Sequence, residues 1–316
     1  MGTRDAVVWR GDALPMATVR APGLPLSMHS RLAGVALQLA ALATFVCMDT
    51  LIKLLAAGFP VTQVMWARFL FGFITVAIAL RVITGHFPWR SKAPGWQTLR
   101  SLTLAGCNFI FTNALVHIPL ADATAVGFAS PLFTITLAAI VLKEAVGWRR
   151  WAGVAIGMFG VLVLLRPPFI FGGAPVHWAM VLPLGTAALF AVYQILTRRL
   201  AGLDDPRTTI FHTSLSASLV LTATTPFIWT WPGPSGWGAL MLLGVLGGIG
   251  HGLLVMAFAR APASLLAPMS YTQIIWAVLA GMLVFGDVPD VLTMVGMVIV
   301  AAGGVLVALP DRRQTA

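Results

Sequence analysis

The residues best suited to chemistry in this chain are polar side chains embedded in long apolar segments. Asp49 and Arg68 are the only charged residues expected well inside such segments, and His251 lies between two glycines in another. Because a charge in bilayer hydrocarbon costs about 2.5 to 3.5 kcal/mol, Asp49 and Arg68 should face the protein interior and each other. They could form a substrate or proton site. A structural ion pair, which Lys53 could also join, is favoured because a carboxylate paired with arginine titrates poorly near neutral pH.

Histidine and tyrosine side chains could line a polar cavity. His251 could bind substrate or carry a proton, or it could be a hydrogen-bonded residue of a helix interface. Tyr193 and Tyr271, the two tyrosines of the chain, lie inside apolar segments, whereas aromatic residues usually gather at membrane interfaces. This pattern indicates either a cavity for an aromatic or planar solute or hydrogen bonds between helices. The candidate set is Asp49, Arg68, Asn113, Tyr193, Gln194, His251, Tyr271, Gln273 and Trp276, with Asn108, Ser130 and Thr134 as weaker members.

The composition indicates which elements position these residues. Hydrophobic residues make up 59% of the chain and charged residues only 9%, against about 25% charged in soluble proteins. An all-α integral membrane protein surrounded by the lipid bilayer is therefore predicted. The net charge of +10 is spread over many short loops, which argues against nucleic acid as a partner. No metal-ligand spacing, catalytic constellation or phosphate loop occurs, so we expect neither an enzyme nor a cofactor.

Ten segments have the length and composition needed to cross about 30 Å of hydrocarbon. We place these transmembrane helices at 34–56, 62–83, 98–117, 121–142, 149–166, 178–197, 209–230, 236–258, 263–285 and 291–309. Lys and Arg residues other than Lys53, Arg68 and Arg166 then fall on the side of the N-terminus. Both termini should therefore be cytoplasmic and the protein should lie in the bacterial inner membrane. Residues 1–33, expected to be disordered, and 310–316 would be cytoplasmic tails.

The chain contains an internal repeat. A shift of 143 residues superimposes Pro119 on Pro262, Glu144 on Asp287, Gly153 on Gly296 and Gly160 on Gly303. Each half, 34–166 and 178–309, holds five spans, and this odd number requires the second half to enter the membrane upside down. Two inverted five-helix repeats are typical of secondary transporters that hold a small-molecule substrate near the bilayer midplane. A membrane enzyme and a channel are the competing classes, and neither has a supporting motif.

Glycines and prolines inside the spans indicate how the helices pack. Glycines recur at helical spacing in the fifth and tenth spans, at Gly153, Gly157, Gly160, Gly296 and Gly303. Such faces favour close helix packing within the bundle, although they would also allow a homodimer. Three prolines interrupt spans and would give either static kinks or the bending that alternating access needs: Pro131, Pro183 and Pro268.

Several short motifs resemble those of one transporter family. They are Trp66-Ala-Arg-Phe-Leu-Phe-Gly72, Pro119-Leu-Ala-Asp-Ala-Thr124, Lys143-Glu144, Ala261-Pro-Ala-Ser264 and Phe285-Gly-Asp287. On these residues the chain resembles the drug/metabolite transporter superfamily, and in particular its ten-helix EamA-type members, over residues 31–310. The resemblance implies a central cavity lined mainly by spans one, three, four, six, eight and nine, and it gives Arg68 a recurring position. Uptake of a vitamin such as riboflavin or of a nucleoside-like compound, and export of amino-acid-like or toxic compounds, both fit. Coupling to a proton or substrate gradient is expected, since no nucleotide-binding motif is present.

Overall fold

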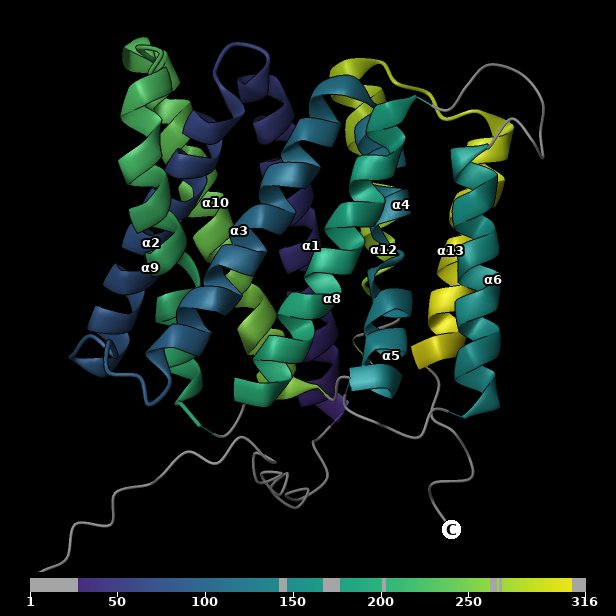
Figure 1. The fold of residues 1–316 in the computed structure, drawn as a ribbon, viewed down its shortest axis with the longest axis horizontal. Coiled ribbons are helices and arrows are strands. Elements are labelled where there is room, and N and C mark those ends of the chain that lie inside the picture. The colour runs from purple at the N-terminus through teal and green to yellow at the C-terminus, as the bar shows by residue number, and fades with distance from the viewer. Residues whose placement is uncertain are drawn as a thin grey trace, which may run out of the picture.

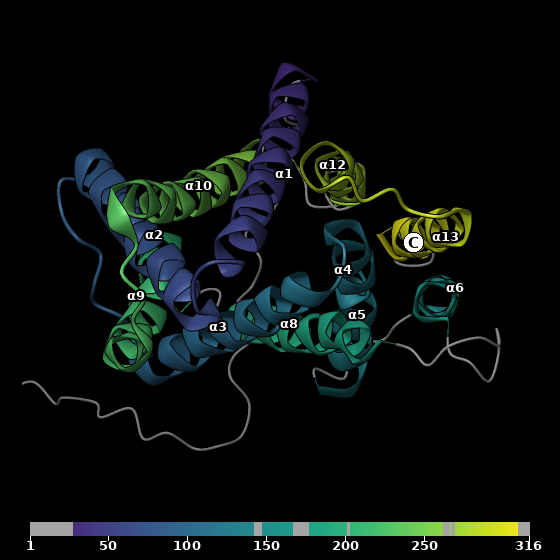
Figure 2. The same ribbon diagram turned by 90° about the horizontal axis from the view of Figure 1, so that it is seen from above.

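The computed structural model describes residues 28–141, 147–166, 177–200, 203–261, 266 and 269–308, and the regular elements within them are helices. The helices of the first half are α1 (Met28–Ala56), α2 (Val61–Thr84), α3 (Pro94–His117), α4 (Leu120–Gly127), α5 (Ser130–Val141) and α6 (Trp148–Leu165). Those of the second half are η1 (Trp178–Val181), α8 (Leu182–Leu200), α9 (Pro206–Thr224), η2 (Thr225–Ile228), α10 (Gly233–Arg260), α12 (Thr272–Ala280), η3 (Gly281–Phe285) and α13 (Val291–Ala308). They form one bundle, with α6 and α13 as a pair at one side (Figures 1 and 2).

Helical segments occupy each of the predicted spans, but the spans differ in apolar character. Six stretches of the described chain are long and apolar enough to cross a membrane: Met28–Ala56, Val61–Thr84, Leu120–Val141, Trp148–Leu165, Trp178–Thr197 and Gly233–Ala257. Two apolar stretches are shorter, Thr272–Phe285 and Val291–Leu306. The helices α3 and α9 are not among these stretches, because they carry many polar side chains.

The polar side chains of α3 and α9 face each other. Gln97 and Ser101 of α3 are completely buried. The hydroxyl of Ser101 donates to the carbonyl oxygen of Thr213 at 2.6 Å, and Nε2 of Gln97 donates to Oγ1 of Thr209 at 3.1 Å. A buried polar group without a hydrogen bond costs free energy. The α3–α9 interface therefore keeps the polar side chains of both helices hydrogen-bonded and away from lipid.

The apolar core lies between the helices of the two halves. Its largest fully buried side chains come from α1, α2, α3, α4 and α10, and include Met48, Met65, Leu115, Leu120 and Leu240. A second buried cluster joins α4, α5, α6, α8, α12 and α13.

Prolines account for interruptions in two of the predicted spans. The fourth span is divided, since α4 ends at Gly127 and α5 begins at Ser130. Pro131 accounts for this division because its ring would clash with the carbonyl four residues earlier, that of Gly127. Pro183 likewise is the second residue of α8, directly after the 3-10 turn η1, so the sixth span also changes its helix at a proline. Pro268 lies outside the described residues.

The glycine faces of α6 and α13 pack directly on each other, which confirms close packing within the chain. A Cβ added to Gly303 would lie 2.5 Å from the backbone nitrogen of Gly157, and one added to Gly160 would lie 2.7 Å from the backbone nitrogen of Val300. Only residues without side chains allow such an approach. A homodimer, which stays a prediction, would therefore have to use another surface.

Candidate functional site

Arg68 and Asp49 do not form the direct ion pair that their sequence positions suggested. Arg68 of α2 instead donates a hydrogen bond to Oδ1 of Asn108 in α3. Asp49 of α1 is 7% exposed, and its carboxylate has no hydrogen bond or salt bridge to the described residues. Lys53 has turned to a different carboxylate, that of Asp287. The hydrogen-bond partner of Arg68 is thus uncharged, and the Asp49 carboxylate has none within the described residues.

Arg68 and His251, which the sequence placed in different spans, line the same small cavity. The cavity lies between α2, α3, α9 and α10, and its lining includes Arg68, Leu104, Thr213, Ser214 and His251. The His251 ring also meets Phe45 of α1 edge-on, with 5.0 Å between ring centroids. The volume of about 20 Å³ is room for roughly one water molecule. Of the six spans that the resemblance placed around a cavity, only the third and eighth, α3 and α10, contribute to this one.

Arg100, which the charge count placed on the cytoplasmic side at the start of the third span, is a buried charge. It lies in the second turn of α3 and is only 3% exposed. Its guanidinium donates to the hydroxyls of Tyr193 at 2.9 Å, Thr197 at 2.8 Å and Thr213 at 3.0 Å. It also lies over the Tyr193 ring, 4.8 Å from the centroid. Burial of this charge was not expected from the sequence, and its partners are threonines and a tyrosine of α8 and α9.

The two tyrosines have separate surroundings and do not share one aromatic cavity. Tyr193 stacks on Phe190 of its own helix as well as on Arg100. Tyr271, just before α12, is 8% exposed and packs against Phe128, with 5.0 Å between centroids. Its buried hydroxyl has no hydrogen-bond partner within the described residues. Next to it, the hydroxyl of Ser270 accepts a hydrogen bond from the side-chain amide of Gln38.

The remaining candidates are less directly tied to these groups. Asn113 donates to the carbonyl of Phe109 in its own helix at 2.7 Å, so its amide is used locally. Gln194 and Gln273 are half-buried. Trp276 is 40% exposed and lies beside the still more exposed Ile275, on the outward side of α12 rather than among its buried residues.

Charged residues join the two halves at one end of the bundle, which we call the Lys53 end. Nζ of Lys53 lies 3.4 Å from Oδ2 of Asp287 and donates to the carbonyl of Ile118 at 3.1 Å. Arg166, which ends α6 in a left-handed conformation, donates to the carboxylate of Asp290 just before α13. The hydrogen bond from Arg166 and that from a backbone N–H hold the pKa of Asp290 below its usual range.

At the opposite end, which we call the Asp204 end, one carboxylate ties the α2–α3 connection to the start of α9. Asp204 accepts hydrogen bonds from the side chains of Ser91 at 2.6 Å and Gln97 at 2.8 Å and from the backbone N–H of Lys92 at 2.7 Å. Burial alone would raise the pKa of Asp204, but the hydrogen bonds from Gln97, Ser91 and Lys92 outweigh it and hold that pKa below its usual value.

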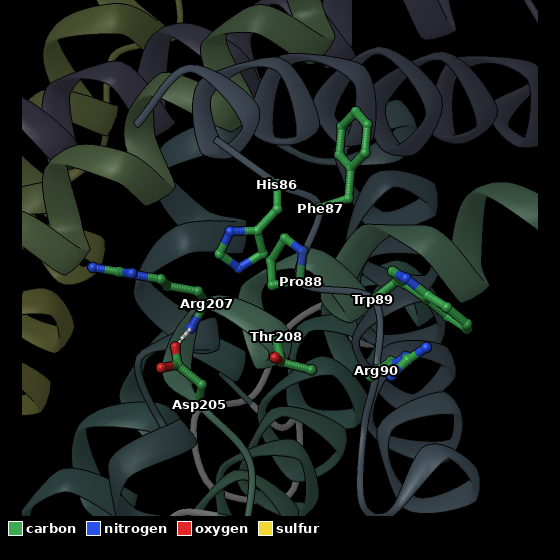
Figure 3. A pocket seen from close by; sticks show the side chains of 8 residues that line it. All are labelled: His86, Phe87, Pro88, Trp89, Arg90, Asp205, Arg207 and Thr208. Carbon is green, nitrogen blue, oxygen red and sulfur yellow. Dashed lines mark hydrogen bonds between the residues drawn. The ribbon is translucent and has the colours of Figure 1, made fainter. Parts of the chain in front are cut away.

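A cavity of about 460 Å³ opens beside this tether. Its lining residues are His86, Phe87, Pro88, Trp89, Arg90, Asp205, Arg207 and Thr208 (Figure 3). Asp205 is occupied as the cap of α9, since Oδ1 accepts from the backbone N–H of Arg207 at 2.7 Å. Figure 3 shows the guanidinium groups of Arg90 and Arg207 pointing away from each other, so they do not converge on one ligand.

The long apolar helices of this bundle indicate a multi-pass membrane protein, and comparison with known families gives its class. The model of the EamA-like transporter family matches residues 32–166 and 177–309. The chain therefore belongs to the EamA-like transporter family, within the drug/metabolite transporter superfamily, and is a transporter of small molecules.

Its named relatives differ in what they carry. The chain is 25% identical to an S-adenosylmethionine uptake transporter of Rickettsia prowazekii, over 91% of this chain and 96% of the relative. It is 27% identical to a riboflavin transporter of Vibrio cholerae (73% and 77%) and 27% identical to a pseudopaline exporter of Pseudomonas aeruginosa (84% and 93%). A crystal structure of another protein shares the fold with a TM-score of 0.61 at 22% identity, over 91% of this chain and 99% of that one.

Proposed function

We propose that this chain is a secondary transporter that carries a small organic metabolite across the bacterial inner membrane by alternating access between two inverted five-helix repeats. The observation that carries the proposal is a reciprocal contact between α6 and α13. The 143-residue shift of the internal repeat aligns Gly160 with Gly303 and Gly157 with Val300. Gly160 contacts Val300, and Gly303 contacts Gly157. Such reciprocity is the signature of a two-fold axis, because residue i meets j and j meets i.

A second contact supports the same axis. The same shift aligns Phe128 with Tyr271, and the rings of these two residues are in contact. A residue that meets its own equivalent lies on a two-fold axis. The helix interruptions correspond as well, since the gap between α4 and α5 includes Phe128, and α12 begins directly after Tyr271. Interrupted helices at a repeat interface are where carriers of this architecture hold their substrates.

The packing of whole helices supports the axis independently of single residues. The repeat matches α1 with α8 and α3 with α10. Accordingly α1 packs on α10, and α8 packs on α3. The helices α2 and α9, equivalent to each other, are also in contact. Exchange of the two halves thus leaves these helix contacts unchanged.

The proposed topology assigns the repeats to 34–166 and 178–309, with ten spans and both tails, 1–33 and 310–316, in the cytoplasm. The bias of Lys and Arg toward one side supports this orientation. The Lys53 end then faces outward, and the ion pairs of Lys53 with Asp287 and of Arg166 with Asp290 join the halves there. These links favour a state closed to the outside, and their opening would be part of the transport cycle.

Transport of S-adenosylmethionine-like or riboflavin-like compounds can be tested by counterflow, which needs no knowledge of the coupling ion. Purified protein in proteoliposomes is preloaded with unlabelled S-adenosylmethionine, riboflavin or an amino acid, and uptake of the labelled compound is followed. We expect one compound to be taken up transiently above its equilibrium level only when it is present inside. Simple downhill flux without this stimulation would indicate a channel, and no flux of any compound would contradict the proposal for this panel.

A further inference from the structure

Five charged side chains lie together at the Lys53 end, and they are divided unequally between the two halves. Lys53 of α1, Asp122 of α4 and Arg166 at the end of α6 belong to the first half. Asp287 and Asp290 belong to the second. Both cations are thus in the first half, and both carboxylates that they contact are in the second. Separation of the halves at this end would take the two cations away from these carboxylates.

The loss of these contacts would fall mainly on the cations. Asp290 would keep a partner, because it also accepts from the backbone N–H of Thr293 at 2.8 Å. The side chain of Asp287 is 32% exposed and can be hydrated, whereas that of Lys53 is only 18% exposed. Lys53 would retain the carbonyl of Ile118, which brings no full charge. A cation largely removed from water costs free energy unless a carboxylate accompanies it.

Asp122 is a carboxylate of the first half that lies close to both cations. It is in the first turn of α4, four residues after Ile118, whose carbonyl Lys53 contacts. Asp122 is half-buried and has no hydrogen bond or salt bridge to the described residues. It interacts electrostatically with both cations, and more strongly with Arg166 than with Lys53. Its two oxygens are therefore available to a cation that moves toward α4.

Both cations have an N–H group to offer this carboxylate. Nε of Arg166 is buried and has no hydrogen-bond partner within the described residues. An ammonium group has three N–H donors, and that of Lys53 meets two acceptors, Asp287 and the carbonyl of Ile118. The first half thus contains unused donors and an unused acceptor at the same end of the bundle.

We propose that Asp122 is a positioning residue of the transport cycle: when the halves separate at the Lys53 end, it replaces Asp287 and Asp290 as the partner of Lys53 and Arg166. The inference rests on the proposed alternating access and adds a residue that makes opening to the outside possible. In the closed state Asp287 and Asp290 repel Asp122, so their departure favours the open state further. Ion pairs would then be exchanged between two states, and no cation would be left alone in either.

Labelling from outside measures this opening without knowledge of the substrate. Thr50→Cys places a thiol at a buried position three residues before Lys53 in α1, in the full-length chain without its two native cysteines. An impermeant maleimide should reach this thiol in intact cells only while the Lys53 end is open. We expect Asp122→Asn to make labelling about 3- to 10-fold slower, because the open state loses its ion pairs. Asp287→Asn should make labelling faster, because the closed state loses one.

The opposite signs of these two effects separate positioning from a structural role. If Asp122 only held the bundle together, Asp122→Asn would lower the melting temperature and make labelling faster, as Asp287→Asn does. Asp122→Glu keeps the carboxylate and should restore at least part of the original rate. Asp122→Ser keeps the test available if Asp122→Asn does not fold. Asp205→Asn is the control at the other end, because asparagine also caps α9.

The outcomes distinguish the inference from the transport function on which it rests. Unchanged or faster labelling with Asp122→Asn would overturn the inference and leave alternating access intact. A thiol at position 50 that reacts in no background, Asp287→Asn included, would contradict opening of this end and count against the transport function as well.

Discussion

A buried carboxylate without a hydrogen bond or salt bridge, as in Asp49, costs stability rather than supplying it. Its presence is easier to understand if the group acts during the cycle, as part of the substrate site or as a proton carrier, than if it holds the resting structure together. The structure thus shifts the balance away from the ion-pair role that the sequence favoured, because the expected close contact with Arg68 is not made.

Asp49→Asn should therefore abolish transport while leaving the melting temperature unchanged or higher, since a buried unpaired charge is removed. Counterflow in proteoliposomes and thermal unfolding in detergent measure the two effects on the same preparation. Asp205→Asn is a suitable control, because asparagine caps a helix as well as aspartate does. Loss of stability with residual activity per folded molecule would instead mean that Asp49 is structural.

At the level of helices, the contact of α6 with α13 is set by glycine. Gly303→Ala would place a methyl group 2.5 Å from the backbone nitrogen of Gly157, and backbone cannot move aside as a flexible side chain can. We expect a loss of about 1 to 3 kcal/mol of stability, seen as a lower melting temperature. Gly252→Ala in α10 is the control, because its added methyl group meets nothing within 4 Å. A similar effect of both changes would refute the close packing.

The link between Arg166 and Asp290 joins the same two helices and has a defined pH dependence. Because the folded-state pKa of Asp290 is lowered, its contribution is present above the unfolded pKa of about 3.9 and is lost as pH falls below that value. The difference in melting temperature between wild type and Asp290→Asn should therefore stay constant from about pH 8 to pH 5 and shrink at lower pH. A difference that disappears near neutral pH would contradict the assigned contact.

The helices also show where sequence reasoning reaches its limit. Apolar runs, the spacing of Gly153 to Gly160 and the position of Pro131 predicted the spans, the close packing and the divided helix, because each acts locally. Arg100 was expected at the cytoplasmic start of the third span, where an arginine normally reaches water. Its burial depends on hydroxyls of α8 and α9, which lie about a hundred residues further along and leave no local signal. The separate surroundings of Tyr193 and Tyr271 depend on tertiary packing in the same way.

For the whole molecule, the proposed orientation gives a direct expectation. A cysteine replacing the exposed Trp231, between α9 and α10, should react with an impermeant maleimide in intact cells, and one replacing the exposed Arg207 should react only after permeabilisation. Both changes are made in a background without Cys47 and Cys107. The reverse pattern would invert the topology, and labelling of both residues in intact cells would contradict the number of spans between them.

The partners of Arg100 have a consequence for biosynthesis. The hydroxyls that it needs belong to Thr197 and Thr213, which follow it by 97 and 113 residues. At about 5 to 20 residues per second, α3 waits on the order of ten seconds before these partners are synthesised. During that interval its arginine has to remain near the lipid headgroups or beside the insertion machinery. The hydrogen bonds of Arg100 in the first half therefore form only after the second half has been synthesised. The two halves produced as separate polypeptides should need each other to insert stably.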